Sequence, residues 1–165
     1  MDNVQIPKAA IILFSMTLLT SPLASASGTG HHHHKEETTS AVGQPAEKSQ
    51  ATKTIHVVMN DKMQFSFQEK PSIKPGETVL FIVKNDGKIP HEFSIGNQHE
   101  HKEHQKMMRE MPNMRHEDGN TITVDPGKTK EIVWQFSGEK EVIFACNIPG
   151  HYEAGMHHAL HLQGK

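Results

Sequence analysis

The chain has 165 residues, with 17 Lys and Arg against 19 Asp and Glu, so its formal net charge is −2. This length suits one domain, and the charge balance excludes a basic surface for nucleic acid. The composition includes 14 His, 9 Met and one Cys. A single Cys excludes an intramolecular disulfide, and these three residue types together are typical of copper or zinc sites.

Residues 1–26 have the pattern of a secretory signal peptide. Lys8 precedes an apolar run over residues 9–19, and small residues at 24–26 provide a cleavage site. The run is much shorter than the ~20 residues that span a bilayer, although an uncleaved anchor is the alternative interpretation. We therefore expect a mature chain that begins near Ser27 and lies in the periplasm, with no membrane span after cleavage.

Residues 27–52 lack apolar periodicity and are rich in small and charged residues, which predicts a disordered linker. The linker carries a run of four histidines, and such a tract can collect metal ions. An expression tag is the alternative, but tags are usually terminal, and this run follows the expected cleavage site. The prediction is a native metal-collecting tail made of His31, His32, His33 and His34.

Residues 53–165 are predicted to form one all-β domain. Short runs rich in β-branched and aromatic residues alternate with turns rich in Pro, Gly, Asn and Asp. One run alternates apolar and polar residues, as in a half-buried strand, and another is almost continuously apolar, as in a central strand. Seven or eight such strands favour a Greek-key β-sandwich. The expected strands are 54–59, 63–67, 78–83, 92–95, 122–124, 131–136, 142–146 and 156–162.

A His/Met-rich insertion interrupts the strands at about residues 97–119. Residues 100–111 have helix-forming composition, and Pro112 ends or kinks the helix. Methionines recur there at helical spacing, either as a face packed on the core or as a thioether site for Cu(I).

The histidines of the insertion favour the metal-binding interpretation. His101 and His104 are spaced to share one face of the helix and to chelate together. The candidate accessory ligands of the insertion are His99, His101, His104, Met107, Met108, Met111, Met114 and His116.

Cys146, His151 and Met156 follow one another at steps of five residues, in a loop after an apolar strand. A strand end followed by a tight loop can direct all three side chains to one point. A thiolate, an imidazole and a weak thioether need one more His to complete a mononuclear copper site. His91, at the start of another strand, is the candidate. A buried core thiol with a core methionine is the alternative, and it does not account for the spaced set.

This Cys-x4-His-x4-Met spacing with an upstream His resembles the cupredoxins, small blue-copper proteins, over residues 53–165. The ligand loop is similar to that of rusticyanin, and the tail and insertion resemble the CopI-type periplasmic cupredoxins linked to copper tolerance. The resemblance implies one type 1 copper, alternating between Cu(I) and Cu(II), with His91, Cys146, His151 and Met156 as ligands.

One position departs from the pattern of plastocyanin and azurin. Those proteins carry Asn directly after the first ligand His, where it ties the ligand loops together, and Glu92 stands there in this chain. Glu92 and Asn147 flank the expected ligands and are expected to shape the hydrogen bonding around them, and so the potential and the colour.

Two functions fit this set of residues. The first is copper handling in copper tolerance, with accessory ions bound by the extra His and Met residues. The second is electron transfer between redox partners, with His151 at the centre of a small apolar patch formed by Ile89, Pro90, Ile148, Pro149 and Ala154. An electron carrier does not need the extra ligands, so copper handling is favoured.

An enzymatic function is not expected. A multicopper oxidase needs several His-x-His pairs and commonly a His on each side of the Cys, whereas Ala145 and Asn147 flank Cys146. The chain is also too short for a two-domain oxidase or nitrite reductase. The expected partners are copper ions and a redox or copper-trafficking protein of the cell envelope, and nothing in the sequence demands more than a monomer.

Overall fold

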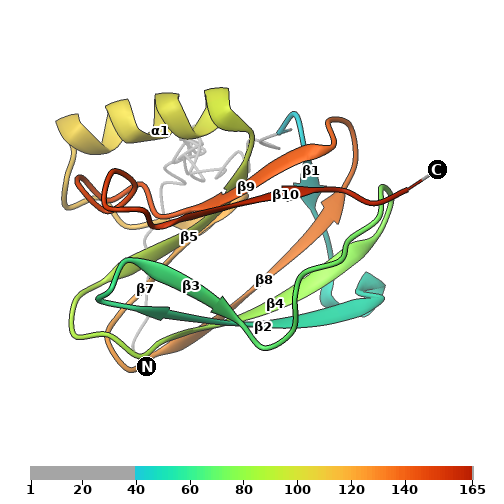
Figure 1. The fold of residues 1–165 in the computed structure, drawn as a ribbon, viewed down its shortest axis with the longest axis horizontal. Helices are drawn as coiled ribbons and strands as arrows, with labels where there is room; N and C mark the ends of the chain where they lie inside the picture. The colour runs from blue at the N-terminus through green and yellow to red at the C-terminus, as the bar shows by residue number, and fades with distance from the viewer. Residues whose placement is uncertain (1–39, 165) are drawn as a thin grey trace, which may run out of the picture. The chain divides into compact units, whose positions relative to one another are not determined.

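The computed structural model describes residues 40–164, apart from the side chain of Asp118. Two five-stranded sheets face each other, and one helix lies along the second sheet (Figure 1). The first sheet has the order β1-β8-β4-β2-β3 and the second β10-β9-β5-β7-β6. The pair β2 and β4 is parallel, and the other pairs are antiparallel. The predicted all-β sandwich is confirmed.

The strands and helices have the following bounds. The first sheet contains β1 (Gly43–Pro45), β2 (Lys53–Asn60), β3 (Gln64–Phe67), β4 (Thr78–Asn85) and β8 (Thr129–Phe136). The second contains β5 (His91–Gly96), β6 (Glu117–Asp118), β7 (Thr121–Val124), β9 (Glu141–Ala145) and β10 (His157–His161). A 3-10 turn, η1 (Lys48–Gln50), follows β1, and helix α1 (Gln98–Glu110) follows β5. Each of the eight expected strands is present.

The sheets pack through aromatic side chains that alternate along the strands. Phe81 from β4 meets Phe93 from β5 and Phe144 from β9, with ring centroids 5.2 and 5.3 Å away. Phe93 and Phe144 stack at 5.2 Å. All three rings are fully buried, and such aromatic contacts add to the stabilisation from apolar burial. The core therefore fixes β5 against β4 and β9.

Helix α1 begins at Asn97, whose side chain accepts the backbone N–H of Glu100 at 2.9 Å. The Glu100 carboxylate in turn accepts the backbone N–H of Asn97 at 2.8 Å, which completes a capping box. The helix contacts β5 and β9 and covers their outer face (Figure 1). Because the core covers the other face, all six residues of β5 are buried. The predicted helix is confirmed and begins two residues earlier than expected.

The predicted linker over residues 27–52 is wrong for the part that the structure describes. Strand β1 pairs with β8, and Val42 is fully buried in the core. The Glu100 carboxylate also accepts hydrogen bonds from Ser40 Oγ at 3.0 Å and from the Ala41 backbone N–H at 2.9 Å. The segment is too short to show apolar periodicity, so only its tertiary pairing defines it. The predicted signal peptide and His31–His34 lie outside the described residues.

The methionines of the insertion do not form one buried face. Met108 is fully buried, whereas Met111 and Met114 are 46% and 41% exposed. Met111 caps the helix and Met114 follows its end. Packing of the whole stripe of Met107, Met111 and Met114 on the core is therefore wrong. Met107 is partly buried, and the fully buried Met108 lies outside the stripe.

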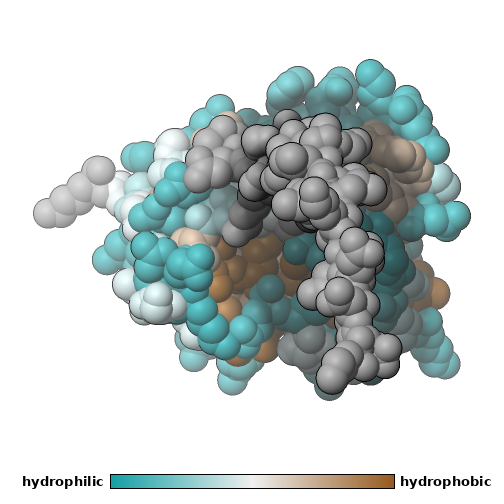
Figure 2. All heavy atoms as spheres, turned by 180° about the vertical axis from the view of Figure 1, so that it is seen from behind, coloured by the Kyte–Doolittle hydropathy of each residue, from teal (hydrophilic) through white to brown (hydrophobic). Residues whose placement is uncertain are grey.

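Hydrophilic residues predominate on the face seen in Figure 2, with apolar residues gathered in a smaller area. Within residues 40–164, no helix combines the length and apolar character needed to cross a bilayer.

Candidate metal centre

The loop between β9 and β10 is closed by backbone hydrogen bonds. The N–H of Cys146 donates to the carbonyl of Met156 at 3.0 Å, and the N–H of Met156 donates to the carbonyl of His151 at 3.0 Å. Gly150 and Gly155 have φ angles of 88° and 103°, a left-handed conformation that glycine adopts without strain. These bonds and turns bring the three residues of the spaced motif together at the end of β9.

His91 reaches the same place from the start of β5. Asn85, fully buried at the end of β4, donates from its side-chain amide to the carbonyls of Ile89 at 2.8 Å and Val124 at 2.9 Å. Its side-chain oxygen accepts the N–H of Gly87 at 2.8 Å. Asn85 therefore fixes the loop that leads into His91, and no pattern in the sequence indicated this role.

Three potential ligand atoms converge between the two loops. His91 Nδ1 and Cys146 Sγ each lie 3.3 Å from His151 Nδ1, and the three donor atoms all lie within 4.8 Å of one another. His91 and Cys146 are fully buried, and Met156 is fully buried beside Cys146. Two imidazoles and one thiol sulfur fit a transition-metal ion of intermediate softness.

Burial dominates the electrostatics of these groups. It raises the pKa of the Cys146 thiol to about 12, against the opposing effect of the Glu92 N–H, which donates to Sγ at 3.2 Å. Burial also lowers the pKa of His91 and of His151, so both rings are neutral near pH 7. A bound cation would favour the thiolate, because its positive charge offsets the negative charge of the sulfur in these low-dielectric surroundings.

Asp61 orients the His91 ring from the side opposite the thiol. Its carboxylate lies 3.2 Å from His91 Nε2, which turns Nδ1 toward Cys146 and His151. The backbone N–H of Lys88 donates to both carboxylate oxygens and lowers the pKa of Asp61. A carboxylate behind a ligand imidazole is a common device for fixing the ring. No sequence pattern pointed to Asp61, because it lies in a turn 30 residues before His91.

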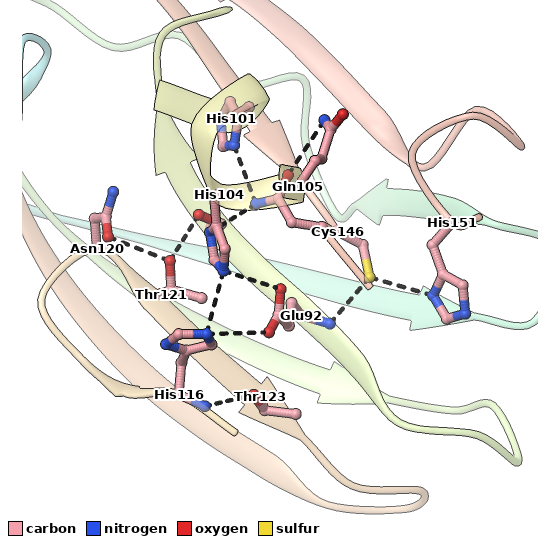
Figure 3. Close-up of polar contacts among 12 residues, drawn as sticks. Glu92, His101, His104, Gln105, His116, Asn120, Thr121, Thr123, Cys146 and His151 are labelled. Atoms are coloured by element: carbon pink, nitrogen blue, oxygen red, sulfur yellow. Dashed lines mark hydrogen bonds and ion pairs between the residues drawn. The ribbon is translucent and has the colours of Figure 1, made fainter. Parts of the chain in front are cut away.

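A second cluster lies on the other face of β5, beneath α1 (Figure 3). Glu92 is fully buried, and its two carboxylate oxygens lie 3.8 Å from His104 Nε2 and 3.9 Å from His116 Nε2. The two Nε2 atoms are 3.2 Å apart. Among the described residues, neither carboxylate oxygen has a partner at ordinary hydrogen-bond geometry. Glu92 thus faces away from the first cluster while its backbone N–H contacts it.

Burial also sets the charges of this second cluster. Burial raises the pKa of Glu92 to about 7, although the Asn147 backbone and the Thr123 hydroxyl favour the charged form and lower that pKa. Burial, followed by the neighbouring His116 and His101, lowers the pKa of His104 to about 4. The cluster therefore presents neutral imidazole to a carboxyl group that is costly to ionise without a cation.

The expected pairing of His101 with His104 takes a different form. Both Nδ1 atoms face the side-chain amide of Asn147, at 3.2 and 3.0 Å. His101 Nε2 also bonds to the carbonyl of Ile143 at 2.8 Å, so both of its ring nitrogens have protein partners. His104 keeps Nε2 for the second cluster, and His99 is exposed. Asn147, expected near the first cluster, therefore supports the helix side.

No protein-family model matches the chain. Three curated relatives do match it, and all are called copper-resistant cuproprotein CopI. The protein from Vibrio cholerae is 52% identical over 117 residues, which cover 71% of this chain and 69% of that one. The protein from Pseudomonas aeruginosa is 40% identical over 148 residues, covering 70% and 79% of the two chains. The relative from Rubrivivax gelatinosus is 44% identical over 114 residues.

Solved structures show the same fold at low sequence identity. Auracyanin B matches with a TM-score of 0.60 and 15% identity, covering 74% of this chain and 97% of its own. A reduced auracyanin from Roseiflexus castenholzii matches with a TM-score of 0.56 and 17% identity, covering 69% and 99%. With relatives at 40 to 52% identity that match over about 70% of this chain, the chain belongs to the CopI-type cupredoxin family.

Proposed function

We propose that this protein is a periplasmic copper-binding cupredoxin that acts in copper tolerance. One type 1 copper would be held by His91, Cys146, His151 and Met156. The observation that carries the proposal is the convergence of two neutral imidazoles and the single thiol in a buried place. The name of the CopI relatives, copper-resistant cuproprotein, agrees with it.

The bound copper supplies one-electron redox chemistry, and the protein supplies a fixed set of ligands. The Glu92 N–H donates to Cys146 Sγ and favours the thiolate. Asp61 holds the His91 ring in one orientation, and Asn85 fixes the loop before it. A ligand set fixed in this way accommodates Cu(I) and Cu(II) with little rearrangement.

Copper handling is preferred to simple electron transfer because the protein carries metal-binding residues that a carrier does not need. Glu92, His104 and His116 already form a second cluster of potential ligands. In this role the protein receives or passes on copper within the cell envelope, as a carrier rather than an enzyme. Exposed Met111 and Met114 and the histidine tail are the other proposed accessory ligands.

A specific observation supports electron transfer as the second candidate. His151 is only partly buried, and exposed apolar residues lie beside it in the sequence and at the neighbouring loop: Ile89, Pro149 and Ala154. An apolar surround with a partly exposed ligand edge suits a transient redox partner.

An optical and EPR titration with Cu(II) tests the proposed function, with Cys146→Ser as the matched variant. We expect an intense visible band from thiolate to copper that saturates near one equivalent and is absent in the variant. Equal, weakly coloured binding by both proteins would overturn the ligand assignment. Further equivalents that bind without the band favour copper handling, whereas saturation at one equivalent favours the electron carrier.

A further inference from the structure

We propose that Glu92, His104 and His116 form a second metal site, for a divalent cation of borderline softness such as Cu(II) or Zn(II). The site uses no sulfur ligand and lies on the opposite face of β5 from Cys146. It deepens the proposed copper handling, which counts this cluster among the accessory ligands, and it stands whether or not the first centre binds copper.

The three ligands come from separate elements, each of which is fixed. Glu92 lies in β5, between β7 and β9. His104 lies in α1, with its Nδ1 atom 3.0 Å from the Asn147 side-chain amide and its Nε2 atom toward Glu92. Ligation through Nε2 requires the amide to turn its oxygen toward Nδ1, which then carries the proton. The backbone of His116 bonds to Thr123 in both directions, through its N–H to Oγ1 and its carbonyl to the N–H, each at 2.8 Å. The site is therefore built on rigid structure rather than on a loose surface loop.

The distances match those between ligands of one metal ion. Metal–nitrogen and metal–oxygen bonds of 2.0–2.2 Å in tetrahedral geometry place ligand atoms roughly 3.3 Å apart. The observed separations are 3.2 Å between the imidazoles and 3.8 and 3.9 Å from the imidazoles to the carboxylate. A shift of a few tenths of an ångström in the side chains would complete the coordination.

The burial of Glu92 points to a cation as the missing partner. A fully buried carboxylate without hydrogen bonds at ordinary geometry is costly, and natural proteins pair such groups or use them to bind metals. The Nε2 atoms of two histidines lie 3.8 and 3.9 Å from its oxygens, and a neutral imidazole is a strong metal ligand. A metal ion bound between these groups would compensate the charge of the buried Glu92 carboxylate.

The ligand set also defines the class of metal. Two imidazoles and one carboxylate suit Zn(II) and Cu(II) and give soft Cu(I) no thioether. Met111 and Met114 are exposed after the end of α1, and Met108 is buried. Three protein ligands leave a fourth position open for water or an incoming group.

Calorimetric titration with Zn²⁺ tests the site in a full-length background in which Cys146 and His31–His34 are all replaced by Ser. These changes remove the thiolate and the tail from the measurement. Adding His104→Asn or Glu92→Gln should weaken one Zn²⁺ equivalent by more than about 10- to 100-fold, the loss typical of an outer partner of a metal ligand. His99→Asn is the matched control, because His99 is exposed on the same helix, and it should leave that equivalent unchanged.

Thermal unfolding without zinc shows whether each variant folds, and Zn²⁺ should raise the melting temperature of the background and of His99→Asn but not of His104→Asn. Equal zinc affinity in the background, His104→Asn and Glu92→Gln overturns the second site. The visible thiolate–copper band of the unmodified protein reports separately on the first centre. A missing band with an intact zinc equivalent overturns the proposed function alone, and a present band with no effect of His104→Asn overturns the second site alone.

Discussion

The two ligand clusters lie back to back on β5 and differ in how the chain builds them. The first joins one contiguous loop, from Cys146 to Met156, to a single residue at the start of β5. The second joins Glu92, the next residue on that strand, to histidines 12 and 24 residues later. Consecutive residues of a strand face opposite sides of the sheet. One strand therefore presents an imidazole to a thiol on one side and a carboxylate to two imidazoles on the other.

The comparison shows that α1 does more than cover the sheet. In a plain sandwich the outer face of β5 would meet water, and a glutamate there would be solvated. Here α1 and the segment before β7 bury Glu92 completely and bring His104 and His116 to it. The insertion makes the Glu92 side chain a ligand of the proposed second site, while the Glu92 backbone N–H still donates to Cys146 Sγ.

The largest expected effect comes from the core that both clusters share. Phe93→Ala removes a fully buried ring in contact with Phe81 and Phe144, and we expect the free energy of unfolding to fall by about 3–5 kcal/mol. Urea unfolding measures it, and both clusters should lose metal affinity together because both depend on β5. Phe65→Ala, at a half-buried ring, should cost less. Loss of affinity at only one cluster would contradict the shared dependence.

The next prediction concerns how the stability of the metal-free protein depends on pH through Glu92 of the second cluster. The pKa of Glu92 is raised from 4.5 to about 7, so the folded state binds this proton more tightly than the unfolded state does. Its contribution to stability is present below pH 4.5 and is lost as the pH rises to about 7. Relative to the unmodified protein, Glu92→Gln should therefore gain stability over that interval, by up to about 3 kcal/mol.

Unfolding in urea at several pH values, with a chelator present, measures this difference. Glu103→Gln, at an exposed residue of α1, is the matched control. A stability difference for Glu92→Gln that does not change with pH would show that the Glu92 carboxyl group titrates normally in the folded protein.

The smallest effect should distinguish the two clusters most cleanly. Asn85→Ala removes two hydrogen bonds to buried or partly buried carbonyls, and we expect a loss of about 1–3 kcal/mol in the free energy of unfolding. Because Asn85 fixes the loop before His91, copper affinity at the first centre should fall while zinc affinity at the second stays. Asp86→Ala, at the exposed neighbour, is the control. Equal losses at both clusters would argue against a local role for Asn85.

Local pattern was enough for most of the fold. The alternation over residues 63–67, most of which form β3, and the continuous apolar run of β4 follow directly from which faces are buried. The helix was predicted from the composition of residues 100–111, whereas the capping box of Asn97 and Glu100, which starts it two residues earlier, was missed. Strand β1 was missed because its three residues are too few to show an apolar period. They form a strand only because they pair with β8.

For the candidate site, too, some features could be predicted from the sequence and others only seen in the structure. The sequence by itself determined the spaced Cys146, His151 and Met156, because residues of one loop keep a fixed spacing, and it singled out His91 as their candidate partner. Only the tertiary structure decided that Asp61 orients His91, that Asn147 turns to the helix, and that Glu92 meets His104 and His116. Those contacts join elements far apart in the chain, and their geometry is set by how α1 packs on β5, which no local pattern encodes.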